Sequence, residues 1–281
     1  MSQPVPPLIK LNNGLSMPQL GLGVWQTKDG PEVELAVSTA IETGYRLFDT
    51  AAVYGNETGV GNAIRASRVR REELFITTKL WNSDQGYDRT LKAFDASLKK
   101  LQLDYIDLYL IHWPVPARGL FTETWRAFEE LYAQGRVKAI GVSNFKTHHL
   151  DELLAMATIK PAVNQVELHP YFPQTELRDY ARRHNIAIES WSPIGGGRSE
   201  LLEEPLLSKI GQSYNKSPAQ VVIRWHLQSG LIVIPKSTHS DRIRENYQVF
   251  DFELTQVEMT DIDSLRTDVR VGFDPDSANF H

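Results

Sequence analysis

Four side chains that could carry acid–base chemistry stand near the ends of short apolar segments in the first half of the chain. Asp49 ends LFD, Lys79 ends LFITTK and His112 ends YIDLYLIH, while Tyr54 follows Asp49 by five residues. A phenol has an ordinary pKa of about 10, so it is a poor acid–base group at neutral pH. A nearby ammonium lowers that pKa because it favours the phenolate. We therefore expect Lys79 to lower the pKa of Tyr54, with Asp49 holding the lysine.

Such a cluster could protonate a carbonyl oxygen while a hydride arrives at the carbon. His112 would donate a hydrogen bond to the same oxygen. Buried charges are costly unless they are paired, and Asp49 with Lys79 would supply that pairing. Spacing alone leaves two interpretations open: a functional cluster, or an ion pair that only stabilises the fold. Taken singly, His112 would be read as a core histidine.

These residues need a scaffold that brings strand ends together, and the sequence alternates between two patterns. Short apolar segments predict strands at 20–23, 46–49, 74–79, 105–111, 137–142, 162–167, 186–191 and 231–235. Helical patterns stand at 31–43, 57–66, 87–100, 121–134, 147–157, 174–184, 217–229 and 240–247. Parallel strands need crossover connections, so this alternation predicts an α/β fold with a parallel sheet.

About eight strand–helix units favour closure into a (β/α)8 TIM barrel, in which the strand ends meet on one side. The preceding LIKLNNGLSMPQLGLG predicts an N-terminal β-hairpin with Asn13-Gly14 in the turn. The rival is an open doubly wound sheet, whose dinucleotide fingerprint is G-x-G-x-x-G. Gly21-Leu22-Gly23 continues as Val24-Trp25-Gln26, so that fingerprint is absent.

Composition bounds the function classes. The chain has 281 residues, 41% of them hydrophobic, which can bury a full core, and we expect a single domain over 1–281. The net charge of −5 argues against nucleic-acid binding, and the lack of cysteine excludes thiolate catalysis and cysteine-ligated metals. No signal pattern and no apolar run of about 18 residues is present, so a cytoplasmic protein without a membrane partner is expected.

The sequence resembles the aldo-keto reductase family over essentially its whole length. The resemblance is carried by GYRLFDTAAVYGNE, FITTKLW, DYIDLYLIHWP, GVSNF, NQVELHP, SWSPIG and VIPKS followed by RIREN. It implies an NADPH-dependent carbonyl reductase on a (β/α)8 barrel, and we expect a monomer. LQLDYIDLYLIHWPVP and AQVVIRWHLQSGLIVIPKS are most similar to bacterial 2,5-diketo-D-gluconate reductases. The implied substrates are therefore 2,5-diketo-D-gluconate or small aldehydes and dicarbonyls such as methylglyoxal.

The resemblance also implies the site residues. The catalytic residues would be Asp49, Tyr54, Lys79 and His112, with Tyr54 as the general acid in reduction. The expected NADPH contacts are Ser143, Asn144 and Gln165 on the nicotinamide carboxamide, Trp191 on its ring, Lys236, Ser237, Thr238 and Arg242 at the 2′-phosphate, and Glu245 and Asn246 at the adenine. Ser192 is a further expected cofactor-binding residue. Trp191 stands where family members commonly stack a tyrosine. Arginine can fork onto a phosphate, and lysine serves as a point charge.

Aromatic residues are candidates for the substrate pocket. Trp25, Trp81 and Trp113 each follow a predicted strand, and Phe273 lies in the C-terminal tail VGFDPD. They could line a concave, largely apolar pocket, although we expect at least one to pack against the barrel rim. After the last strand we expect one helix and then a loop.

Two alternatives remain. A metal-dependent hydrolase would need clustered histidines and carboxylates, but neither H-E-x-x-H nor H-x-H occurs. His148 and His149 are expected to diverge at a helix start, and His169 lacks evident partners, so no metal is predicted. The other alternative is an NADPH-binding member of the family that has a regulatory or structural role without catalysis.

Overall fold

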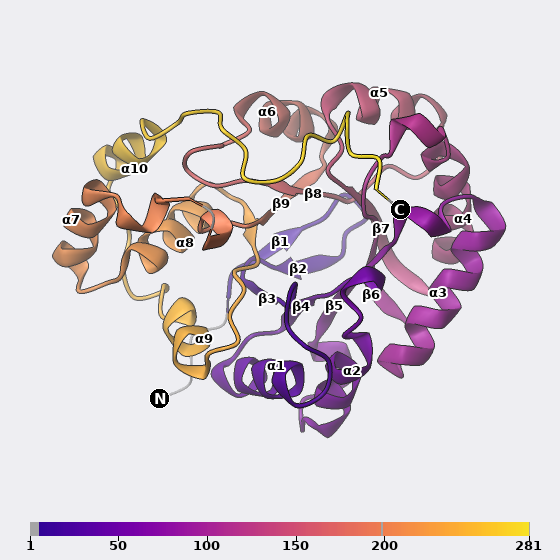
Figure 1. Cartoon of the computed structure of the whole chain (residues 1–281), viewed down its shortest axis with the longest axis horizontal. Coiled ribbons are helices and arrows are strands. Elements are labelled where there is room, and N and C mark those ends of the chain that lie inside the picture. The colour runs from indigo at the N-terminus through magenta and orange to yellow at the C-terminus, as the bar shows by residue number, and fades with distance from the viewer. Residues whose placement is uncertain (1–5, 198, 281) are drawn as a thin grey trace.

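Eight parallel strands form one ring in the computed structural model, which describes residues 6–197 and 199–280 (Figure 1). In chain order they are β3 (Gly21–Gly23), β4 (Leu47–Asp49), β5 (Phe75–Leu80), β6 (Ile106–Ile111), β7 (Val137–Ser143), β8 (Val163–Glu167), β9 (Ala187–Trp191) and β10 (Ile232–Val233). Each strand pairs with the next, and backbone hydrogen bonds from Val233 N to Gln19 O (2.9 Å) and from Gly23 N to Pro235 O (3.2 Å) close the ring. The predicted (β/α)8 barrel is confirmed.

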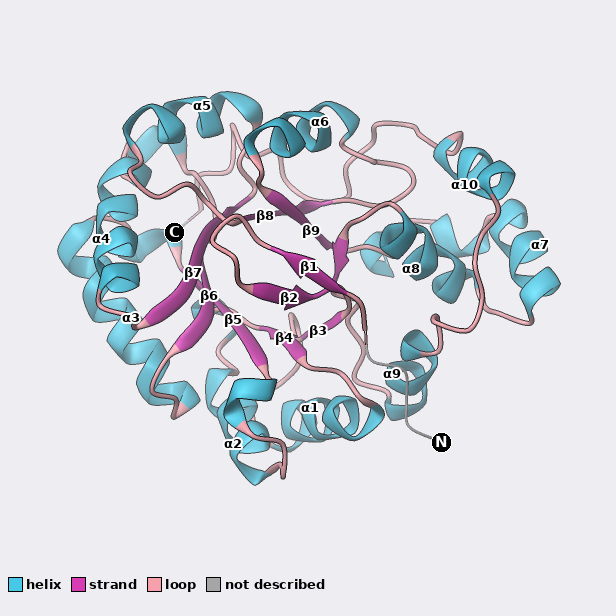
Figure 2. Cartoon of the chain, turned by 180° about the vertical axis from the view of Figure 1, so that it is seen from behind, coloured by secondary structure: helices cyan, strands magenta, loops and turns pink. Residues whose placement is uncertain are grey.

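The N-terminal hairpin is also confirmed. Strands β1 (Leu8–Lys10) and β2 (Ser16–Pro18) pair antiparallel, and Gly14 takes a positive φ of 85° in the turn between them. Figure 2 shows the hairpin lying over one end of the barrel. Leu11 and Met17 are buried there against strand residues such as Leu47. The hairpin therefore closes the amino-terminal end of the ring and leaves the carboxyl end for the site.

Helices surround the ring on the outside (Figures 1 and 2). They are α1 (Pro31–Thr43), α2 (Glu57–Ala66), α3 (Tyr87–Leu101), α4 (Phe121–Ala133), α5 (Thr147–Met156), α6 (Thr175–His184), α7 (Pro205–Tyr214), α8 (Pro218–Gln228), α9 (Ser240–Tyr247) and α10 (Gln256–Asp263). Most of them bury apolar residues toward the ring, with Trp125 of α4 and Trp225 of α8 fully buried, whereas α7 packs on α8 and α10 packs on α7. None of the helices that the structure describes is long and apolar enough to cross a membrane.

Two of these helices were not predicted. Helix α7 starts at Pro205 and buries Leu207 and Ile210, whereas α10 buries only Ile262. The expectation of one helix after the last strand is therefore wrong, because α9 and α10 both follow β10. A weak apolar stripe hid α10, but a capping box was readable: Thr255 and Glu258 exchange the side-chain to backbone bonds of that motif.

Candidate active site

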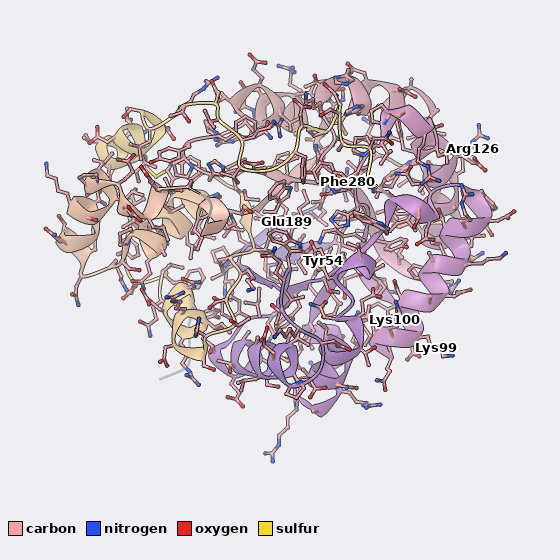
Figure 3. All side chains as sticks on the ribbon, viewed as in Figure 1. Tyr54, Lys99, Lys100, Arg126, Glu189 and Phe280 are labelled. Atoms are coloured by element: carbon pink, nitrogen blue, oxygen red, sulfur yellow. The ribbon has the colours of Figure 1, made fainter. Side chains whose placement is uncertain are left out.

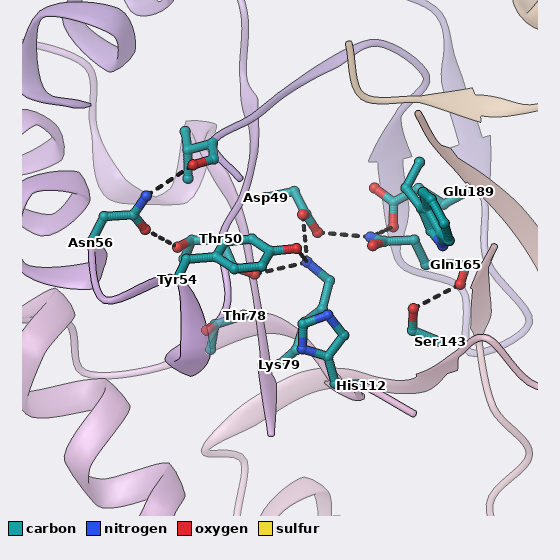
Figure 4. A network of polar contacts seen from close by, with 12 residues as sticks. Asp49, Thr50, Tyr54, Asn56, Thr78, Lys79, His112, Ser143, Gln165 and Glu189 are labelled. Atoms are coloured by element: carbon teal, nitrogen blue, oxygen red, sulfur yellow. Dashed lines mark hydrogen bonds and ion pairs between the residues drawn. The ribbon is translucent and has the colours of Figure 1, made fainter. Parts of the chain in front are cut away.

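A buried ammonium lies at the centre of the strand-end cluster. Lys79 is fully buried on β5, and its Nζ donates to Asp49 Oδ1 at 2.5 Å, to Thr50 O at 2.9 Å and to Tyr54 Oη at 3.3 Å (Figure 4). An ammonium has three N–H donors, and these contacts engage all of them. The structure thus brings together three of the four predicted catalytic side chains in one contact network.

The loop that carries Tyr54 is fixed by a buried asparagine. A short 3-10 turn, Ala52–Tyr54, follows β4, and Asn56 comes just after it. The Nδ2 group of Asn56 donates to Val24 O and Thr27 O, both at 2.9 Å, and its Oδ1 accepts from Thr50 Oγ1 at 2.8 Å. These bonds tie the loop to the one after β3. Asn56 was not predicted as part of the site, and its position in a Gly/Asn-rich turn was the only signal.

The ion pair of Lys79 with Asp49 controls the charges of the site. Burial alone lowers the pKa of Lys79, but Asp49 and Tyr54 outweigh it and raise that pKa to about 12. Burial raises the pKa of Asp49, and Lys79 and the amide of Gln165 act against that rise. Lys79 is therefore a cation at neutral pH.

The pKa of Tyr54 differs from the prediction. Lys79 does lower it, as expected, but burial of the phenol is the larger effect and raises the pKa above its ordinary value of 10.0. The predicted net decrease is wrong, because spacing reveals the neighbouring cation and not the loss of water around the hydroxyl. At neutral pH, Tyr54 consequently carries its proton.

His112 completes the predicted set as a neutral imidazole. Its ring lies 5.7 Å from the ring of Tyr54 between centroids. Burial, together with the charge of Lys79, lowers the pKa of His112 well below 6.5. Its Nδ1 is buried without a hydrogen-bond partner among the described residues. A buried N–H without an acceptor is unfavourable, so the proton belongs on Nε2.

The predicted carboxamide contacts lie next to the catalytic cluster. Gln165 Nε2 donates to Asp49 Oδ2 and to Glu189 Oε2, both at 2.7 Å, which leaves its carbonyl oxygen free to accept from a ligand amide. Asn144 Nδ2 donates to Ser143 Oγ at 3.1 Å, and Trp191 Nε1 donates to Asn144 Oδ1 at 2.9 Å. The second N–H of Asn144 donates to His112 O at 2.9 Å, and the Ser143 hydroxyl donates to Gln165 O at 2.8 Å. The polar atom left open to a ligand amide is therefore the carbonyl oxygen of Gln165.

The predicted phosphate-binding residues lie in the loop after β10 and in the first turn of α9. Lys236 of the loop and Arg242 of the helix are both exposed, and no ion pair of either is found within the described residues. Ser237 is buried, and its Oγ accepts from His239 N at 3.1 Å. The remaining predicted cofactor residues are half-buried or buried: Ser192, Thr238, Glu245 and Asn246. Two unpaired cations next to a helix start fit an anionic group.

The predicted aromatic residues do not form one wall. Trp81 lies edge-on to His112 at 5.3 Å, and Trp113 is buried. Both contact Phe280, which stacks on Trp81 at 5.8 Å and meets Trp113 edge-on at 5.2 Å. The sequence reasoning missed Phe280 and chose Phe273, which is 65% exposed but touches Phe280 at 5.3 Å. Trp25 is 40% exposed and lies outside the apolar cluster of Trp81, Trp113 and Phe280.

The C-terminal tail reaches the site because it is anchored along its length. It runs from α10 across the face of the barrel (Figure 1). The backbone N–H groups of Val271 and Gly272 donate to the buried carboxylate of Glu167, at 2.5 and 3.0 Å. His169, the lone metal candidate, contacts the same carboxylate at 3.1 Å. Figure 3 labels Tyr54 and Phe280 toward the middle of the view, while Lys99, Lys100 and Arg126 lie on the outer helices.

A second anchor of the tail involves the adjacent histidines. The rings of His148 and His149 lie 4.0 Å apart and both approach Asp276, so the prediction that they diverge is wrong. Together the three could offer ligands to a metal ion. Against that, the backbone N–H of Lys146 donates to His149 Nδ1, which places the imidazole proton on Nε2. The Lys146 ammonium also lies 2.7 Å from Asp276, so the charges favour a tail anchor over a cation site.

Comparison with known proteins shows which family has this sequence pattern. A model of the Aldo/keto reductase family matches residues 19–267. The chain belongs to the aldo/keto reductase family. It is 56% identical over 270 residues to the 9,11-endoperoxide prostaglandin H2 reductase of Trypanosoma cruzi, with 96% of this chain and 95% of that protein covered. It is 54% identical over 272 residues to the glyoxal reductase of Bacillus subtilis, covering 97% of each.

A solved structure supports the same placement. An alanine mutant of the protein Gox0644, in complex with NADPH, superposes with a TM-score of 0.92 at 47% identity, covering 99% of this chain and 100% of that chain. The predicted family and enzyme class are thus confirmed: the chain is an oxidoreductase of the aldo-keto reductase type.

The buried ion pair can be tested through stability. Lys79→Met leaves Asp49 buried without a counter-ion, and we expect it to lower the free energy of unfolding at pH 7 by about 3–5 kcal/mol. Because Lys79 lowers the pKa of Asp49, the variant's Asp49 takes up a proton more readily, and the deficit should shrink as pH falls from 7 to 5. Urea unfolding at several pH values measures both.

The double variant Asp49→Asn with Lys79→Met is the control, because it removes both charges and should recover much of the loss. A deficit below about 1 kcal/mol in Lys79→Met would contradict a paired, desolvated lysine.

Proposed function

We propose that this enzyme uses NADPH to reduce small aldehydes and dicarbonyls to alcohols, with Tyr54 as the general acid. The observation that carries the proposal is the contact of Tyr54 Oη with the buried Lys79 ammonium, which Asp49 holds in turn. A phenol that keeps its proton at neutral pH, next to a fixed cation, is suited to donate that proton and to tolerate the negative charge left behind.

When bound, NADPH supplies a hydride to the carbonyl carbon, and the two electrons of the carbonyl π bond move to its oxygen. Tyr54 transfers its proton to that oxygen, which yields the alcohol and a phenolate. The Lys79 ammonium at 3.3 Å stabilises the phenolate, and Asp49 keeps the ammonium in place. His112 donates from Nε2 to the carbonyl oxygen and orients it, since its low pKa keeps the ring neutral and therefore not itself the acid.

The same proposal assigns the cofactor contacts. Gln165, Asn144 and Ser143 would bind the carboxamide, and Trp191 would stack on the nicotinamide with Ser192 beside it. Toward the other end, the 2′-phosphate and adenine would be bound by Lys236, Ser237, Thr238, Arg242, Glu245 and Asn246. Support comes from the carbonyl oxygen that Gln165 leaves available. It also comes from the two exposed cations after β10, which form no ion pair with any residue that the structure describes.

For the substrate we propose a small dicarbonyl such as methylglyoxal, with 2,5-diketo-D-gluconate as a further candidate. Trp81, Trp113 and Phe280 place aromatic surface beside His112, and Trp25 and Phe273 would lie at the outer rim of the pocket. The Bacillus subtilis relative is named a glyoxal reductase, which supports the dicarbonyl class. If purified protein binds NADPH but oxidises none with phenylglyoxal, methylglyoxal or 2,5-diketo-D-gluconate, the proposed reductase activity is wrong.

The role of Tyr54 predicts a specific kinetic loss. Tyr54→Phe should bind NADPH nearly as well as the parent, while kcat for methylglyoxal falls by about 10²–10⁴-fold, the usual effect of a positioned acid. Steady-state kinetics and fluorescence titration with NADPH measure the two quantities. Near-normal turnover in Tyr54→Phe would remove Tyr54 from the mechanism.

The phosphate assignment predicts a cofactor-specific effect. Replacing Lys236 and Arg242 together by alanine should weaken NADPH at least about tenfold, because charge-assisted hydrogen bonds contribute about 1.5–3 kcal/mol each. NADH lacks the 2′-phosphate, so its affinity should change less than about twofold. Arg244→Ala is the matched control, since Arg244 lies on the same helix but pairs with Asp241. Equal weakening of both cofactors would contradict the assignment.

A further inference from the structure

A second carboxyl group lies buried beside the catalytic network, and the proposed mechanism does not use it. Glu189 on β9 is fully buried and stands opposite Gln165 in the parallel register. The Gln165 amide donates one N–H to Glu189 Oε2 and the other to Asp49 Oδ2, both at 2.7 Å (Figure 4). A continuous chain of contacts thus runs from Tyr54 through Lys79, Asp49 and Gln165 to Glu189.

The network holds one cation for two carboxyl groups. The ionisable groups that face Glu189 are Asp49 from β4, Lys79 from β5 and, further along the chain of contacts, Tyr54. All three N–H groups of Lys79 are engaged by other acceptors. The Oε1 atom of Glu189 has no hydrogen-bond partner within the described part of the chain.

An ionised Glu189 would therefore be a buried charge with one hydrogen bond and another carboxylate as its neighbour. Such a charge is strongly disfavoured unless the group takes a proton. Burial, followed by repulsion from Asp49, raises the pKa of Glu189 to about 8. The Gln165 amide and Lys79 oppose this rise without cancelling it. Near neutral pH, Glu189 is thus chiefly a carboxylic acid.

We propose that Glu189 is a positioning residue that supports carbonyl reduction only while it is neutral. As the acid, it fixes the Gln165 amide and leaves Lys79 balanced by Asp49 alone. The inference rests on the proposed function and goes beyond it, because it assigns the alkaline limit of the activity to a group that does not touch the substrate.

Ionisation of Glu189 raises the pKa values of the neighbouring groups in the network. Loss of its proton to solvent adds a second negative charge, which raises the pKa of Tyr54 and of Lys79. A phenol of higher pKa gives up its proton less readily, so Tyr54 becomes a weaker acid. Reduction therefore slows as Glu189 ionises, before Tyr54 itself loses its proton.

Glu189→Gln separates this role from simple packing. A glutamine has nearly the same shape and stays neutral, and its carbonyl oxygen can still accept from Gln165. The NH2 group of the glutamine takes the place of Oε1, the oxygen that would carry the proton in neutral Glu189. The variant is thus a permanent mimic of the protonated state. The matched control is Glu57→Gln, a buried glutamate on α2 that hydrogen-bonds Thr78 outside the network.

The test is the pH profile of kcat/KM for methylglyoxal between pH 6 and 10. We expect Glu189→Gln to match the parent at pH 6.5 and to exceed it by about tenfold one pH unit above the parent's alkaline pKa, because its decline begins at higher pH. Glu57→Gln should follow the parent's profile. An alkaline decline at the same pH in Glu189→Gln and the parent would overturn the proposal, as would a pH-independent loss of activity in the variant.

A second measurement does not depend on turnover. Between the unfolded pKa near 4.3 and the folded pKa, the folded protein keeps a proton on Glu189 that the unfolded chain has lost. The contribution of Glu189 to the free energy of unfolding must then fall as pH rises from the unfolded pKa to the folded pKa. The thermal midpoint of Glu189→Gln minus that of the parent should rise from pH 5 to 8 and level off above.

The pH profile and the thermal midpoints together separate two possible errors: that Glu189 is not neutral, and that its neutral form has no role in reduction. A constant midpoint difference would overturn a neutral Glu189 even in an active enzyme. A rising difference without turnover in any variant would confirm the neutral acid but overturn its role in reduction, together with the proposed function.

Discussion

The arrangement of the site depends on one buried ion pair. A lysine inside a barrel wall is tolerated only if its charge is balanced and its three donors are satisfied, and Asp49, Thr50 and Tyr54 meet both conditions. That requirement fixes where the loop after β4 must run. It also places a phenol against a cation that holds its proton at neutral pH. Tyr54 thus lies beside a cation because the buried Lys79 ammonium needs acceptors in place of water.

The surrounding fold supplies what the pair needs. The hairpin closes the amino-terminal end of the barrel with Leu11 and Met17, so the polar cluster opens only toward the carboxyl end. Asn56 ties the Tyr54 loop to the loop after β3. The tail, held at Glu167 and at Lys146, brings Phe280 over Trp81.

The alternation of strand and helix patterns predicted the barrel, and the Asn13-Gly14 turn predicted the hairpin. The residues at the strand ends predicted the pairing of Asp49 with Lys79, because neighbouring strands lie side by side and buried charges need partners. The sequence did not predict the raised pKa of Tyr54, since desolvation depends on everything packed around a group. It also missed Phe280 and Asn56, whose positions are set by contacts distant in sequence. Helix α10 escaped for a different reason, since it buries so little that its apolar pattern is weak.

In the proposed mechanism, proton transfer from Tyr54 accompanies hydride transfer from NADPH. Single-turnover reduction of methylglyoxal, followed in H2O and D2O with NADPH carrying either hydrogen or deuterium at the transferred position, tests it most directly. We expect both isotopic substitutions to slow the same step in the parent enzyme, and the solvent isotope effect on that step to disappear in Tyr54→Phe. A full effect of cofactor deuterium with no solvent effect in the parent would contradict it.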